Sequence, residues 1–357
     1  MTMRLPMLVA LSLALAGAPS PGRAQDVAVK ATEGERYCFP GHLGGWKQSA
    51  QAASDGRFYG LTLAQSRLYL ARMDSVRAIL RAAPVLNPPM GMRASAWTDF
   101  CCTSQCQLAK TCGTRPPYGR IWLNFNYFIA SKPTDPPFTI DELRSEAELF
   151  FNNPHRVFDS SPLTKLADGR GVFWLPLPSG QVGGMTLYRN QSGDDRYVFF
   201  TRNGPPLWVP VSREQFASAL LREREADLAK NVADVPAQYR DQIVQANGPL
   251  LDPLRAELRR MSAAERASQA WVNNTMGNGD ILVPAHSSDG RPLVALNPGY
   301  FDLTRPRTDI QLIVLRLEGI PPAERKPGYA NCSDLGSDRL VQFVGEVNWA
   351  RVMQLVR

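Results

Sequence analysis

The sequence predicts an α+β protein in which antiparallel β-meander sheets and segregated helices are stabilised by disulfide bonds. Segments with strand periodicity group between Gly171 and Val211 and again towards the C-terminus, whereas helical periodicity dominates between Arg213 and Trp271. Strands and helices grouped in this way favour an α+β fold over a wound parallel sheet. Six cysteines in 357 residues supply material for cross-links.

Two helices are expected in the N-terminal half. Thr62 can cap the first, which runs to about Ala83, and one apolar stripe follows it at helical spacing: Tyr69, Met73, Val76, Leu80 and Ala83. A second helix is expected from Thr139 to about Phe151. Its start is indicated by a capping box, Thr139 with Glu142, and by a hydrophobic staple, Phe138 with Leu143.

Two further capping boxes mark helix starts at Ser212 and Ser262, each followed three residues later by Gln or Glu. The charged region that begins at Ser212 extends with helical character to Trp271. Gly248 and Pro253 interrupt it, so we expect two or three helices there rather than one.

The clearest predicted strand is Ile121–Ile129. Its core face carries Ile121, Leu123, Phe125, Tyr127 and Ile129, because these apolar residues alternate with the others. Four strands after Gly171 are predicted to form a meander: Val172–Leu177, Met185–Arg189, Tyr197–Thr201 and Leu207–Val211. Asn203–Gly204, between the last two, indicates a hairpin turn.

The last part of the chain returns to strands. We expect strands at Ile281–Ala285, Leu293–Leu296 and Asp309–Leu317, followed by a short closing helix at Asn348–Val356. The third of these strands is apolar on both faces except at Gln311 and Arg316, which predicts a central position in its sheet.

The Pro-rich connector Lys132–Pro137 is the best candidate domain boundary. It separates an N-terminal disulfide-containing region, residues 25–135, from an α+β region, residues 136–357. The two regions could also form one continuous globular unit.

Residues 1–24 have the layout of a secretory signal peptide. Arg4 precedes an apolar run, and the small residues Gly22 and Ala24 suit cleavage before Gln25. The run is too short to span a bilayer, and no later segment is longer, so no integral membrane segment is expected. The sequence therefore predicts a soluble protein exported to the periplasm or the extracellular space.

Export favours disulfides over metal binding for the cysteines Cys38, Cys101, Cys102, Cys106, Cys112 and Cys332. Soft thiolates can also bind metal, but the spacing lacks the paired C-x2-C units of structural zinc sites. Adjacent Cys101 and Cys102 should have different partners. Cys38 and Cys332 could pair with each other, although the preferred prediction ties each of them to the Cys101–Cys112 cluster.

The charge pattern argues against nucleic-acid binding. The formal net charge is +7, and the most charged stretch, Arg213–Trp271, contains nine basic and nine acidic residues. A nucleic-acid surface needs a patch of one sign. No phosphate-binding glycine motif or other cofactor signature occurs, so no cofactor is predicted.

Trp122, Asn124 and Asn126 form the candidate ligand site. They lie on the non-core face of the predicted strand Ile121–Ile129, where two amides between aromatic residues could contact a polar ligand. The alternative is that these amides form hydrogen bonds with the backbone of neighbouring loops, as buried amides usually do.

No catalytic motif is recognisable, and no family resemblance is found. The best catalytic candidate is His155 with Asp159 nearby or with Glu148 on the preceding predicted helix, because a carboxylate can orient a general base. No nucleophile or oxyanion site accompanies them. The sequence therefore predicts a non-catalytic binding or envelope-associated protein, for an unknown protein or small-molecule ligand. The alternative is a secreted hydrolase that uses His155.

Overall fold

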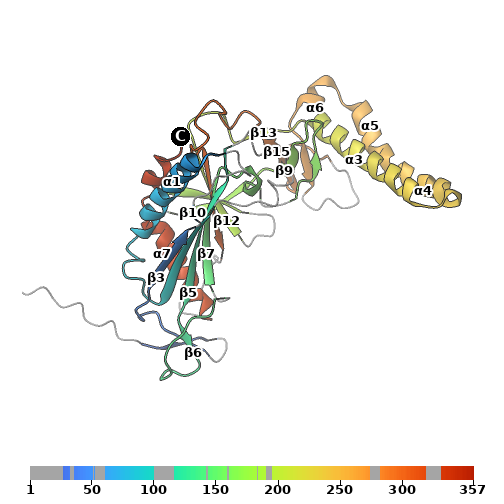
Figure 1. The fold of residues 1–357 in the computed structure, drawn as a ribbon. Helices are drawn as coiled ribbons and strands as arrows, with labels where there is room; N and C mark the ends of the chain where they lie inside the picture. The colour runs from blue at the N-terminus through green and yellow to red at the C-terminus, as the bar shows by residue number, and fades with distance from the viewer. Residues whose placement is uncertain are drawn as a thin grey trace, which may run out of the picture.

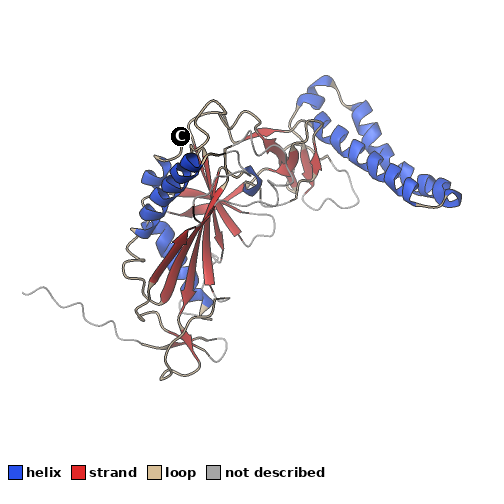
Figure 2. Ribbon diagram, viewed as in Figure 1, coloured by secondary structure: helices blue, strands red, loops and turns tan. Residues whose placement is uncertain are grey.

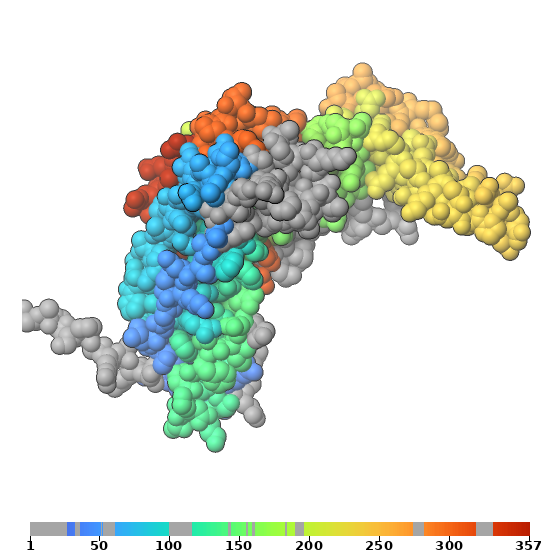
Figure 3. Space-filling view, viewed as in Figure 1, coloured from blue at the N-terminus to red at the C-terminus, as the bar shows by residue number. Residues whose placement is uncertain are grey.

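The structure is a computed structural model that describes residues 27–32, 36–50, 52, 61–99, 116–141, 144–158, 161–182, 184–189, 195–273, 282–318 and 331–357. The predicted signal peptide, Cys101, Cys102, Cys106, Cys112 and Asp159 lie outside these residues. The described chain forms an elongated body and a helical arm that projects from one end of it (Figures 1 and 3).

A large sheet forms the centre of the body (Figure 2). It has eight strands in the order β10-β11-β12-β16-β7-β5-β4-β3. All neighbours are antiparallel except the edge pair β3–β4, which is parallel. The strands are β3 Trp46–Ala50, β4 Met92–Asp99, β5 Gly119–Tyr127, β7 Arg144–Phe151, β10 Leu177–Val182, β11 Met185–Arg189, β12 Asp195–Thr201 and β16 Leu312–Glu318. Strands from both sides of the predicted boundary near residue 135 thus share one sheet, and β16 is central as predicted.

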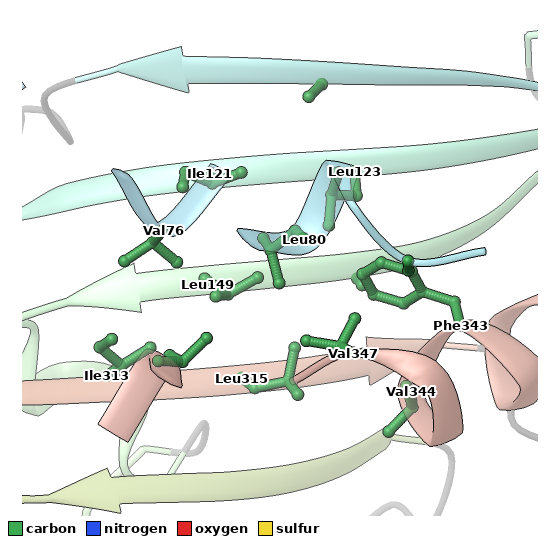
Figure 4. Close-up of a cluster of buried hydrophobic side chains, with 14 of the residues drawn as sticks. Val76, Leu80, Ile121, Leu123, Leu149, Ile313, Leu315, Phe343, Val344 and Val347 are labelled. Atoms are coloured by element: carbon green, nitrogen blue, oxygen red, sulfur yellow. The ribbon is translucent and has the colours of Figure 1, made fainter. Parts of the chain in front are cut away.

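Three helices cover one face of this sheet: α1 Leu63–Arg81, α7 Ser333–Glu346 and α8 Trp349–Met353. The predicted Thr62 cap of α1 is present, and its apolar stripe is buried. The stripe packs on alternate residues of the central strands, so Val76 and Leu80 lie over Ile121, Leu123 and Leu149 (Figure 4). The predicted core face of β5 is therefore confirmed, and α8 corresponds to the predicted closing helix.

A second sheet packs on one end of the opposite face. Its order is β13-β15-β9-β8, with β14 also paired to β15. The strands are β8 Thr164–Lys165, β9 Gly171–Trp174, β13 Trp208–Pro210, β14 Trp271–Asn273 and β15 Gly290–Leu296. An aromatic-rich cluster joins the two sheets, with Phe150, Tyr197 and Val314 from the large sheet and Val294 from the small one.

The arm consists of α3 Arg213–Asp234, α4 Arg240–Asn247, α5 Asp252–Arg260 and α6 Ala263–Ala267, with short 3-10 turns at Ala237–Tyr239 and Gly248–Leu251. The capping boxes predicted at Ser212 and Ser262 are both present. The base of α3 packs on the second sheet through Phe216 and Leu220, and α3 and α4 extend away from it (Figure 1).

A small sheet of β1 Val29–Lys30, β2 Tyr37–Cys38 and β6 Ile129–Ala130 lies at the far end of the body. Cys38 in β2 forms a disulfide with Cys332, at the start of α7. The preferred prediction, in which each of these cysteines joins the Cys101–Cys112 cluster, is therefore wrong. Their direct pairing results from α7 packing beside β5 and β7.

Residues 144–151, predicted as the end of a helix, form strand β7 instead. This segment lies between β5 and β16 and pairs with both along its length. Ladder hydrogen bonds on both edges, together with burial of Ala147, Leu149 and Phe151, outweigh the local helix signal. Glu148 therefore lies on a strand and not on a helix.

The predicted meander after Gly171 is divided between the two sheets. β10, β11 and β12 are consecutive antiparallel neighbours, whereas β9 and β13 pair with β15. Asn203–Gly204 consequently connects two sheets rather than the strands of a hairpin. In the predicted strand Ile281–Ala285, the described residues contribute one isolated bridge, Leu282 to Val272.

The fold is α+β with one disulfide, Cys38–Cys332, in the described part of the chain. Among the helices that the structure describes, none is long and apolar enough to cross a membrane.

Candidate functional site

The face of the large sheet opposite the helices is apolar at one end and polar along the rest. Where the second sheet packs, it carries Phe150 and Val314. One row of side chains crosses five strands in register, from Trp97 through Trp122, Glu148 and Arg316 to Tyr197, which is itself buried in the cluster that joins the two sheets. We call the polar surface formed by Trp97, Asp99, Arg120, Trp122, Asn124, Arg144, Glu146 and Glu148 the tryptophan face.

Trp122 is held at the centre of this face. Its Nε1 donates a hydrogen bond to Glu146 Oε2 at 3.0 Å. The guanidinium groups of Arg120 and Arg144 each lie 5.2 Å from the indole centroid, within cation–π range. Arg144 in turn pairs with Glu146. The indole is therefore fixed by neighbours on adjacent strands.

Carboxylates and guanidinium groups alternate across the tryptophan face. Glu148 Oε1 lies 3.5 Å from Arg120, and its Oε2 lies 2.8 Å from Arg316. Arg120 also contacts Asp99 at 3.0 Å, and Arg316 contacts Glu318 at 3.0 Å. Each charge has a partner of opposite sign, so the face is polar without a patch of one sign.

The two amides of the predicted ligand site differ in their surroundings. Asn126 is buried, and its Nδ2 donates to the carbonyls of Ile140 and Asp141 at 3.2 and 3.4 Å. This side chain serves local backbone. Asn124 stands opposite Ser95 and Glu146 on the tryptophan face, and its Oδ1 has no hydrogen-bond partner among the described residues.

Trp97 is one of five residues of this face that the sequence did not predict, with Asp99, Arg120, Arg144 and Glu146. It is directly opposite Trp122, it is 42% exposed, and its Nε1 donates to Asp99 Oδ2 at 3.1 Å. The sequence does carry a signal for this strand, because the apolar residues Met92, Ala94 and Ala96 alternate with Arg93 and Ser95.

Of the catalytic candidates, Asp159 and the side chain of His155 lie outside the described part of the chain. His155 lies in the 3-10 turn Pro154–Arg156, after the end of β7. Both carboxylate oxygens of Glu148 are engaged by arginines. Within the described residues, no group of three or more His, Cys, Asp or Glu side chains is arranged to hold a metal ion.

Comparison with models of protein families, with curated proteins and with solved structures shows no match to this chain.

Proposed function

We propose that the protein is an exported, non-catalytic binding protein whose tryptophan face binds a neutral oligosaccharide. The observation that carries this proposal is the exposed indole of Trp97, which stands opposite Trp122 on a strand face lined with planar polar groups. Its envelope location is supported by the signal-like residues 1–24 and by the Cys38–Cys332 disulfide, since disulfides persist in oxidising compartments.

The chemistry of the face suits a sugar ring. A sugar has a face of C–H groups, which packs on an aromatic ring, and a rim of hydroxyls that both donate and accept. The exposed indole of Trp97 offers the apolar surface. Arg120 and Arg144, whose side chains are 26% and 28% exposed, contribute N–H donors, and Asp99 and Glu146 hold these donors in place.

The shape and charge of the face favour a neutral chain. The tryptophan face crosses three strands, β4, β5 and β7, which are spaced about 4.8 Å apart and so span about 10 Å, the length of about two linked sugars. Because the arginines are paired with carboxylates across the face, a strongly acidic polymer finds no surplus of positive charge there.

Ion pairing also favours binding over hydrolysis. Glu146 is engaged by Trp122 and Arg144, and Glu148 by two arginines. General acid–base catalysis requires a carboxylate that can exchange a proton with the substrate. Both carboxylates here are instead held in ion pairs and hydrogen bonds with neighbouring side chains. The hydrolase alternative with His155 gains no support from these contacts.

Arrays of neutral oligosaccharides, acidic oligosaccharides and polar peptides test the ligand class. We expect the exported form of the protein to bind neutral oligosaccharides, and Trp97→Ala to weaken binding about tenfold or more. Phe138→Ala is the matched control, because Phe138 is also an exposed aromatic residue but lies off the tryptophan face. Unchanged binding by Trp97→Ala, or selective binding of peptides, would refute the proposal. Release of reducing ends from a bound sugar would show that the protein is a hydrolase and not a non-catalytic binding protein.

Export is tested separately by N-terminal sequencing of the protein recovered outside the cytoplasm. We expect the mature chain to begin at Gln25. A chain that retains Met1 and stays in the cytoplasm would contradict the proposed location without bearing on the ligand.

A further inference from the structure

Strand β12 is fully paired on one edge only. Seven residue pairs join it to β16, from Asp195 to Thr201. On its other edge, β11 pairs only at Tyr188 with Tyr197 and at Arg189 with Arg196. From Val198 to Thr201, the described part of the chain provides no strand on that edge.

The divergence of β11 has a local cause. The β10–β11 ladder changes register between Pro178 and Gly180, which marks a bulge. Gly180 has φ +153°, a conformation that favours glycine. A bulge bends and twists the strand pair that contains it, so the hairpin turns away from β12 after only two paired positions.

A cleft of about 560 Å³ occupies the resulting gap. Met185, Thr186 and Tyr188 line it on the β11 side, and Val198–Thr201 lines it on the β12 side. Trp208 of β13 lines it beside Phe199, and Trp349 of α8 lines it beside Phe200. Because successive residues of a strand point to opposite faces, the cleft has lining residues on both faces of the sheet.

Aromatic side chains line the cleft on both faces of the sheet. On one face of the sheet, the ring centroid of Phe199 lies 5.1 Å from Tyr188 and 5.5 Å from Trp208. On the other face, Phe200 stacks on Trp349 with the ring centroids 5.2 Å apart. If an extended peptide lay along β12, the side chains on each of the peptide's two faces would therefore contact apolar surface.

We propose that this cleft binds an extended apolar peptide segment of about four residues, which adds as a strand to the edge of β12. The free edge from Val198 to Thr201 is about 13 Å long, which matches four extended residues. Strand addition of this kind obtains affinity from main-chain hydrogen bonds and selectivity from pockets for alternate side chains. The site is separate from the proposed sugar site and does not depend on it.

A peptide fits this cleft better than an apolar small molecule because the cleft lies beside the backbone edge of β12. It follows a row of backbone N–H and C=O groups on β12, and a ligand without amide groups would leave that polar edge unsatisfied. Such unpaired buried groups cost about 1–3 kcal/mol each. The bound segment should be apolar at successive positions, since aromatic rings line both faces.

The first test is an array of octapeptides in which the number and spacing of apolar residues vary. We expect the full-length mature protein to retain peptides with at least four consecutive apolar residues. N-methylation of alternate backbone amides in a retained peptide should weaken binding about tenfold or more, because it removes main-chain donors. Hydrogen exchange of the amides in residues 195–201 should slow when the peptide is bound.

Variants locate the site. Ala350 lies on the exposed surface of α8 and lines the cleft, so Ala350→Trp should fill the cleft and weaken peptide binding about tenfold or more. Ala226→Trp, at an exposed position of α3 in the arm, should leave binding unchanged. The proposal is overturned if N-methylation has no effect, if Ala350→Trp binds as well as the wild type, or if palmitate binds in the cleft while none of the peptides does.

Discussion

Cys38 and Cys332 form a disulfide across 294 residues of sequence, with their Cα atoms 5.4 Å apart. Cys38 belongs to β2, which pairs with β6 directly after β5, and Cys332 precedes α7. The bond therefore joins the small N-terminal sheet to the helix that covers the large sheet. Both cysteines are buried in one cluster with Tyr127 and Leu335.

Replacing both cysteines, Cys38→Ser with Cys332→Ser, should destabilise the protein by roughly 3–5 kcal/mol. In the chain-entropy account, a cross-link that closes so long a loop restricts the unfolded chain strongly. Urea denaturation without reductant, compared with the wild type, measures the loss. Each single replacement breaks the same bond and should cost a similar amount, and an unchanged denaturation midpoint in all three variants would contradict the expectation.

Glu148→Gln should destabilise the protein by about 2 kcal/mol, because it removes the charge that pairs with two partly buried arginines. The Glu148 side chain is 8% exposed, whereas that of Glu318, the other partner of Arg316, is 51% exposed. Glu318→Gln is therefore a matched control and should cost less than about 1 kcal/mol. Chemical denaturation of both variants is the measurement, and equal losses would show that burial does not govern the strength of these pairs.

Asn152→Ala should cost about 2–4 kcal/mol, since this fully buried side chain supports the turn that follows β7. Its Oδ1 accepts hydrogen bonds from the backbone N–H groups of Gln311 and Leu312 at 2.7 and 3.2 Å, and its Nδ2 donates to the Asp309 carbonyl at 2.9 Å. The backbone φ of Asn152 is 53°, in the left-handed region. Asn adopts this conformation more readily than Ala does, so the substitution also introduces backbone strain.

The control for Asn152 is Asn297→Ala. Asn297 donates to the Pro206 carbonyl and accepts from Gly299 N–H in a more exposed turn. Water can replace these bonds, so the loss of unfolding free energy should be below about 1 kcal/mol. Thermal or urea denaturation compares the two variants. If the Asn152→Ala protein were as stable as the wild type, the Asn152 side chain would not support the turn after β7.

Stability should fall between pH 10 and pH 12 because of Tyr300. Burial raises the pKa of its hydroxyl to about 12, against the opposing effect of Arg202. The hydroxyl donates to the Gln311 carbonyl at 2.8 Å. The folded protein thus binds this proton more tightly than the unfolded chain, whose tyrosine pKa is about 10. The resulting stabilisation is complete below pH 10 and is lost as the pH rises towards 12.

Urea denaturation between pH 9 and pH 11.5 measures this effect, which should reach about 2 kcal/mol. Tyr300→Phe lacks the ionisable group, so its stability should fall less steeply over the same range. Contributions from Tyr127, whose pKa burial also raises, are common to both proteins and cancel. Parallel pH profiles for wild type and Tyr300→Phe would rule out Tyr300 as the source.

Elements with complete local signals could be predicted from the sequence. The capping boxes at Ser212 and Ser262 begin α3 and α6, and Thr62 begins α1 with its apolar stripe buried. The period-2 pattern of Ile121–Ile129 identified the core face of β5. These signals act within a few residues, so the hydrogen bonds and side-chain contacts that they specify do not depend on distant parts of the chain.

The candidate site was predicted in part. Trp122 and Asn124 lie on the tryptophan face, whereas Asn126 binds neighbouring backbone. Trp97 was missed because its place opposite Trp122 depends on the pairing of β4 with β5, across more than twenty residues of sequence. The cleft beside β12 could not be predicted at all, since it arises where two paired strands diverge.

The sequence by itself determined the α+β class, the main capped helices and the inward face of the longest strand, because each follows from local periodicity and capping. Tertiary structure alone decided that residues 144–151 become β7, since pairing with β5 on one side and β16 on the other outweighs a nearby capping pattern. It also decided that Cys38 pairs with Cys332, because only the packing of α7 against β5 and β7 brings two cysteines 294 residues apart into contact.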